Sequence, residues 1–84
     1  MRRAEGKAVL LSRHVDVSKD PGAMAYEIWR SRGDFFVVNI FPDSSKTSTA
    51  ITGRQALDVL RHEMIGSLKR TLTKDGEEFL RNAV

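Results

Sequence analysis

Alternating hydrophobic and polar positions in the first half of the chain predict a series of β-strands. In residues 8–17 the odd positions are apolar apart from one arginine, and this period of two is typical of a strand. Residues 24–31 and 34–41 are rich in β-branched and aromatic side chains, and the Arg32-Gly33 dipeptide between them suits a two-residue hairpin turn. The threonine-rich residues 46–51 predict a short fourth strand.

The hairpin has a preferred register if the two residues that flank its turn are paired. Ile28 then lies opposite Val37, and Trp29 lies opposite Phe36. In this register both faces of the hairpin are largely apolar. Because one main helix covers only one face of a small antiparallel sheet, we expect the second face to meet the short last helix, another copy of the chain or a ligand.

The second half of the chain predicts helices. Residues 52–55, Thr-Gly-Arg-Gln, match a capping box, which marks a helix start. A helical stripe follows, formed by Leu57, Leu60, Met64, Leu68 and Leu72. These features predict one long helix over residues 53–73, in which the central Gly66 costs about 1 kcal/mol relative to alanine. Residues 75–78 can begin a short last helix that docks through Phe79 and Leu80.

These elements predict an α+β fold. We expect a three- to four-stranded antiparallel β-meander with one long C-terminal amphipathic helix packed on one face and a short last helix. A chain of 84 residues suits a single domain over residues 1–84, with residues 1–6 as a flexible basic N-terminus. So small a core also suggests a homodimer. Without cysteine, and without the roughly 18 consecutive apolar residues that span a bilayer, the chain is expected to be cytoplasmic and not in a membrane.

The charge of the chain suggests contact with phosphate groups. Its formal charge is +3, and the basic residues are concentrated in residues 1–14 and 54–74, whereas the middle is almost neutral. Such zones raise the local affinity for phosphate. The second basic zone includes a candidate contact surface of three residues, Lys69, Arg70 and Lys74.

The hairpin supplies the sharpest candidate site. Trp29 and Phe36 form a stacking platform for unpaired bases, with four cations expected around it, namely Arg13, Arg30, Arg32 and Lys46. The sequence therefore predicts a small non-catalytic module that binds single-stranded or structured nucleic acid. The alternative is a protein-binding inhibitor, an antitoxin-like or phage-borne regulator, which would use the exposed apolar sheet face against a protein partner.

The residues that catalysis or metal binding would need are sparse. His14 and His62 are the only histidines, and we expect both to be solvated surface residues without a nucleophile to activate. A zinc site needs three or four clustered ligands, and two separated histidines without cysteine do not supply them. We therefore expect no enzyme activity, no metal and no cofactor.

Two resemblances bear on these alternatives. A meander of four strands followed by a long helix resembles the layout of the coactivator, PUR and Whirly families, which bind single-stranded nucleic acid. Separately, four segments are similar to the opening of HicB-type antitoxins: Tyr26-Glu27-Ile28-Trp29-Arg30, Phe36-Val37-Val38, Phe41-Pro42-Asp43 and Ala56-Leu57. Those antitoxins continue with a Leu-Pro-Gly-type turn, where this chain has Ser44-Ser45-Lys46. The first resemblance implies nucleic-acid binding, and the second implies a protein partner.

Overall fold

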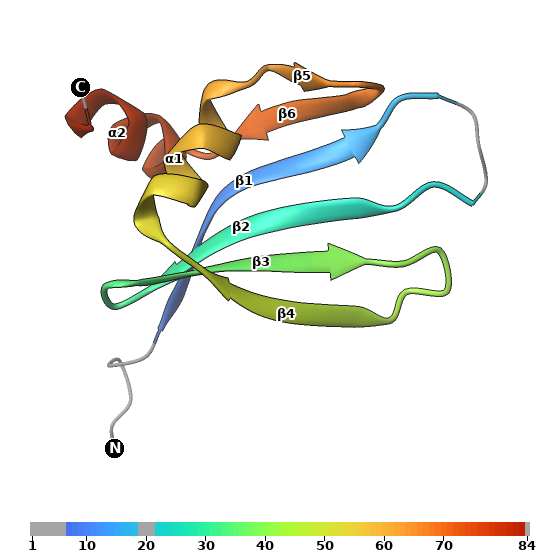
Figure 1. Ribbon diagram of the computed structural model, residues 1–84, viewed down its shortest axis with the longest axis horizontal. Coiled ribbons are helices and arrows are strands. Elements are labelled where there is room, and N and C mark those ends of the chain that lie inside the picture. Colours follow the sequence, from blue (N-terminus) through green and yellow to red (C-terminus); the bar gives the residue numbers. More distant parts are fainter. Residues whose placement is uncertain (1–6, 19–21, 84) are drawn as a thin grey trace.

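The computed structural model describes residues 7–18 and 22–83. Over these residues the chain forms six strands and two helices (Figure 1): β1 (Ala8–Asp16), β2 (Ala25–Ser31), β3 (Asp34–Ile40), β4 (Lys46–Ile51), α1 (Gly53–Arg61), β5 (Met64–Ile65), β6 (Leu68–Leu72) and α2 (Lys74–Asn82). The strands form one antiparallel sheet in the order β4-β3-β2-β1-β6-β5, from bottom to top in Figure 1. The α+β class is confirmed, but the predicted sheet was too small. The expected flexible N-terminus, residues 1–6, lies outside the described residues.

The hairpin of β2 and β3 has the predicted register. Trp29 pairs with Phe36 and Ile28 pairs with Val37. In the turn, Arg32 rather than Gly33 adopts the left-handed conformation, with φ of 59°. The predicted fourth strand is also confirmed, because β4 occupies residues 46–51 and pairs with β3.

A β-bulge divides β1 into two parts. Leu10 pairs with Trp29 and Ser12 pairs with Ile28, so Leu11 is an extra residue in the strand. Leu11 is fully buried in the core. The extra residue inverts the alternation that follows it, so that even positions now face the helices and odd positions face away. The prediction of a strand is confirmed, but its period of two is interrupted at Leu11.

The predicted long helix is wrong beyond residue 61. Helix α1 ends at Arg61, and the hairpin of β5 and β6 follows, with Gly66 in its turn at φ of 62°. A spacing of four residues is also a multiple of the strand period of two. Leu68 and Leu72 therefore share a face of β6 as they would share a face of a helix. The apolar stripe could not distinguish the two conformations.

The starts of both helices are capped by threonine. The predicted capping box is confirmed, because Gln55 N donates to Thr52 Oγ1 (3.0 Å) and Thr52 N donates to Gln55 Oε1 (2.9 Å). Helix α2 begins after Thr73, whose Oγ1 accepts a hydrogen bond from Gly76 N (3.0 Å).

Neither helix of the described ranges is long and apolar enough to cross a membrane.

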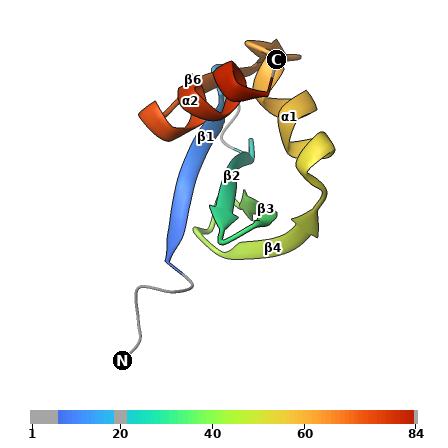
Figure 2. The same ribbon diagram turned by 90° about the vertical axis from the view of Figure 1, so that its left-hand side faces the viewer.

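Both helices pack on the same side of the sheet (Figures 1 and 2). The fully buried core residues come from β1, β2 and α1, and they are Leu11, Ile28, Ala56 and Leu60. Phe79 and Leu80 of α2 pack against this core, as predicted. Since α2 packs beside α1, the last helix does not cover the second face of the sheet. Of the three candidates for covering the second face, a second copy of the chain or a ligand remains.

We expect Gly76→Ala to destabilise the fold strongly. Gly76 is buried, and a Cβ atom added there would overlap the backbone carbonyl oxygen of Leu11. Relief of this overlap requires α2 to move away from the bulge, so the free energy of unfolding should fall by about 2 kcal/mol or more. Urea denaturation measures the loss. Gly33→Ala is the matched control, because nothing lies within 4 Å of its added Cβ. Equal losses in the two variants would contradict the close approach of α2 to β1.

Candidate functional site

The face of the sheet that points away from the helices is the candidate site. Residues paired across antiparallel strands share a face, so Trp29 and Phe36 lie on the side opposite to the buried Ile28. We call this side the open face. Its residues, taken from the strand register, include Leu10, Arg13, Glu27, Trp29, Phe36, Val38, Lys46, Ser48, Ala50 and Lys69.

A shallow hollow of about 400 Å³ lies on the open face over β2, β3 and β4. Trp29 and Phe36 are both half-buried, so part of each ring is accessible from this hollow. Its lining is mostly apolar or uncharged and consists of Ala8, Glu27, Trp29, Ser31, Phe36, Val38, Lys46 and Ser48. The structure thus brings the two predicted stacking residues together in one accessible depression.

A buried carboxylate anchors the edge of this hollow. Glu27 is only 4% exposed. Its Oε1 accepts a hydrogen bond from Trp29 Nε1 (3.0 Å), and its Oε2 accepts from Arg13 Nε (2.8 Å) and lies 2.7 Å from Arg13 Nη2. Charge-assisted bonds of this kind are short and directional. Glu27 therefore fixes the indole ring and one guanidinium group on the open face.

Sequence reasoning missed Glu27. Glu27 and Trp29 are two residues apart, so they share a strand face, and this spacing was the available signal. The pairing with Arg13 was not available, because it depends on the bulge in β1.

The structure brings only part of the predicted cation ring to the platform. Arg13 and Lys46 lie on the open face. Arg30 pairs with Phe35 on the opposite side, and Arg32 lies in the turn that connects β2 and β3. The open face is consequently less basic than the sequence suggested, since the charge of Arg13 is also balanced by Glu27.

The second basic zone is divided among three environments. Lys69 lies on the open face and pairs with Val15, whereas Arg70 lies on the helix side and pairs with His14. Arg70 Nη1 donates to the carbonyl oxygen of Leu60 (2.5 Å), near the end of α1, and so satisfies a carbonyl there. Lys74 is the first residue of α2. The predicted helix would have kept Lys69 and Arg70 together, but alternation in a strand separates them.

His14 is buried on the helix side, so the expectation that it is solvated is wrong. It is 0% exposed, its ring stacks on Tyr26 with centroids 4.5 Å apart, and its Nε2 shares a hydrogen bond with Ser12 Oγ (2.9 Å). Burial, and secondarily the positive charge of Arg70, lowers the pKa of His14 from 6.5 to about 4. The cause is again the bulge, which turns His14 toward the helices.

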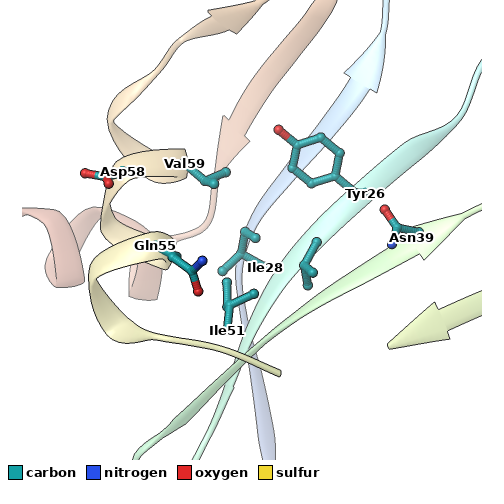
Figure 3. Close-up of a pocket in the computed structure, with 8 residues that line it drawn as sticks. Tyr26, Ile28, Asn39, Ile51, Gln55, Asp58 and Val59 are labelled. Carbon is teal, nitrogen blue, oxygen red and sulfur yellow. The ribbon is translucent and has the colours of Figure 1, made fainter. Parts of the chain in front are cut away.

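A second hollow, of about 450 Å³, lies on the helix side between α1 and strands β2 to β4 (Figure 3). Ile28, Ile51 and Val59 form its apolar part, and the side chain of Asp58 points away from it in Figure 3. None of its lining residues is basic. It therefore offers no positive charge to a phosphate group, and the open face is the stronger candidate.

Neither a metal-ligand cluster in the described residues nor a match to a known protein indicates a function. Within residues 7–18 and 22–83, no group of three or more histidine, aspartate or glutamate side chains could hold a metal ion. No protein-family model, curated protein or solved structure matches the chain. The open face is therefore the feature of the chain on which a function can rest.

We expect the buried His14 to make folding stability depend on pH. With a folded pKa of about 4 against 6.5 in the unfolded chain, only the unfolded chain takes up a proton between these values. Stability should therefore be complete above about pH 6.5 and fall by on the order of 3 kcal/mol as the pH drops toward 4. Urea denaturation across this range measures the loss.

The control for this prediction replaces each histidine in turn. His14→Gln should flatten the pH dependence in this window, whereas the exposed His62 can be changed to Gln without loss of the slope. An unchanged slope in His14→Gln would show that another group is responsible.

Proposed function

We propose that this protein is a non-catalytic module that binds single-stranded or structured nucleic acid on the open face. The observation that carries the proposal is the pair Trp29 and Phe36, directly opposite each other on β2 and β3 and turned away from both helices. Sheets that bind single strands present aromatic side chains in this way, on a helix-free face, so that unpaired bases stack on them.

Cations at the margins of the open face complement the stacking platform. Lys46 lines the hollow beside Trp29 and Phe36, and Lys69 lies at the far side of β1 on the same face. A strand whose bases stack at the centre could direct its phosphates toward these ammonium groups. Arg13 has a different role here, because its bonds to Glu27 make it part of the support for Trp29.

The proposal includes no chemical step. In the described ranges the open face carries no histidine, and its buried carboxylate, Glu27, is already occupied by Trp29 and Arg13. The proposal also includes a cytoplasmic location, which the absence of cysteine supports, and a homodimer.

One observation favours the alternative of a protein-binding inhibitor. Val15 and Met64 flank Lys69 across β1, β6 and β5, and they are 43% and 49% exposed. This apolar extension of the open face suits a protein partner better than phosphate groups. Salt distinguishes the two functions, because phosphate contacts weaken steeply as salt rises and an apolar protein interface responds little.

We expect Trp29→Ala to weaken binding of oligothymidylate or oligouridylate by about tenfold or more. One stacked base contributes roughly 1 to 3 kcal/mol, which corresponds to this loss. Trp29→Phe is the matched control, since it retains a ring and should retain most of the affinity. Trp29 is the only tryptophan, so quenching of its fluorescence reports stacking directly. If saturating oligonucleotide at low salt left this fluorescence unchanged, the nucleic-acid proposal would fail and the protein-binding alternative would replace it.

We expect Lys46→Ala to reduce the salt dependence of the same binding. Loss of one phosphate contact lowers the log–log slope of affinity against salt by about one. Arg30→Ala is the control, because Arg30 lies on the opposite side of the sheet and should leave the slope unchanged. The reverse result, a reduced slope in Arg30→Ala alone, would place the ligand on the helix side.

A further inference from the structure

Strand β4 forms a regular and unprotected edge of the sheet. It pairs with β3 at every residue from Lys46 to Ile51 with no bulge and no proline, and residues 46–50 are all exposed. In the described part of the chain, no strand pairs with its outer side. Backbone groups along such an edge are a template for pairing with another strand.

The opposite edge of the sheet is different. Strand β5 contains only Met64 and Ile65, and a turn with Gly66 in the left-handed conformation follows directly. Very short edge strands are one of the ways in which proteins prevent unwanted pairing. The contrast makes β4 the edge of the sheet that is open to pairing with another strand.

We propose that β4 pairs antiparallel with β4 of a second copy, so that two chains form one continuous sheet. A twofold axis perpendicular to the sheet keeps both open faces on the same side. Because paired residues must share a face, the axis has to pass through a residue position. With the axis at Ser48, this residue faces Ser48 of the partner subunit, and Lys46 faces Ala50 of the partner subunit.

The side chains of β4 are compatible with antiparallel pairing against β4 of a second copy. The only charged residue of the strand, Lys46, lies at its end, so self-pairing opposes no like charges. Thr47 would face Thr49 of the partner subunit, and threonine and serine pairs across strands are stabilising. The neutral hydroxyl side chains supply no charge that would select a different protein. The pairing thus gives the free backbone groups of the edge strand hydrogen-bond partners without repulsion between like charges.

Pairing at β4 would also extend the proposed binding surface. Phe36 pairs with Ala50 of β4, so it would lie three strand spacings, about 14 Å, across the sheet and four residues, about 13 Å, along the strands from Phe36 of the partner subunit. One nucleic-acid strand could then cross both platforms. This extension rests on the proposed function, whereas the dimer itself does not.

The absence of cysteine makes the dimer directly testable by crosslinking. In Ser48→Cys the new thiol is the only one in the chain and lies on the proposed axis. Residues paired across an antiparallel ladder have Cα atoms about 4.5 to 5.5 Å apart, within the range of a disulfide. We expect Ser48→Cys to crosslink under mild oxidation much faster than the control Asn82→Cys, which is exposed on α2. Sedimentation of the unmodified protein should give twice the mass of 9.5 kDa.

Four outcomes separate this inference from the proposed function. A monomer in sedimentation, with equal crosslinking of Ser48→Cys and Asn82→Cys, overturns the dimer. Faster crosslinking of Thr49→Cys than of Ser48→Cys overturns the register centred on Ser48. The double variant Thr47→Lys with Thr49→Lys opposes like charges and should be monomeric, yet a short oligonucleotide should still quench Trp29 in it. If the variant remains dimeric, the β4 interface is wrong, and loss of quenching in the monomer would count against binding by a single platform.

Discussion

The hydroxyl group of Thr73 ties the bulge in β1 to the first turn of α2. It donates to the carbonyl oxygen of Leu10 (2.6 Å) and accepts from Gly76 N (3.0 Å), while the backbone N–H of Thr73 donates to the carbonyl oxygen of Leu11 (3.1 Å). The carbonyl groups that the bulge removes from the regular ladder are thus satisfied by the helix cap. With this link, β1 can exchange the faces of its odd and even residues at Leu11 and still pair with β2 and β6.

The two faces of the sheet acquire their different chemistry from this change. On the helix side, His14 is buried against Tyr26, and its pKa is lowered. On the open face, Arg13 reaches Glu27, which in turn holds the indole of Trp29. The open face therefore has few uncompensated cations, and a nucleic acid bound there would depend on stacking more than on a high density of phosphate contacts.

Local signals were sufficient for the hairpin, β4 and the capping box at Thr52, because neighbouring residues decide each of them. They were insufficient beyond Arg61, since a four-residue apolar spacing fits both a helix and the strand β6. The bulge depends on Thr73, which is 62 residues from Leu11, so no local pattern in β1 could reveal it. For the same reason the pair of Trp29 and Phe36 was predictable, whereas the contact of Arg13 with Glu27 was not.

Nuclear Overhauser spectroscopy of the protein tests the bulge most directly, because it reports which side chains share a face. The structure predicts cross-peaks between the rings of His14 and Tyr26, whose centroids are 4.5 Å apart, and between the Arg13 side chain and Glu27. A strand that alternates without the bulge would exchange the two faces. Cross-peaks from His14 to Ala25 or Glu27, with Arg13 close to Tyr26, would contradict the bulge and the open face that depends on it.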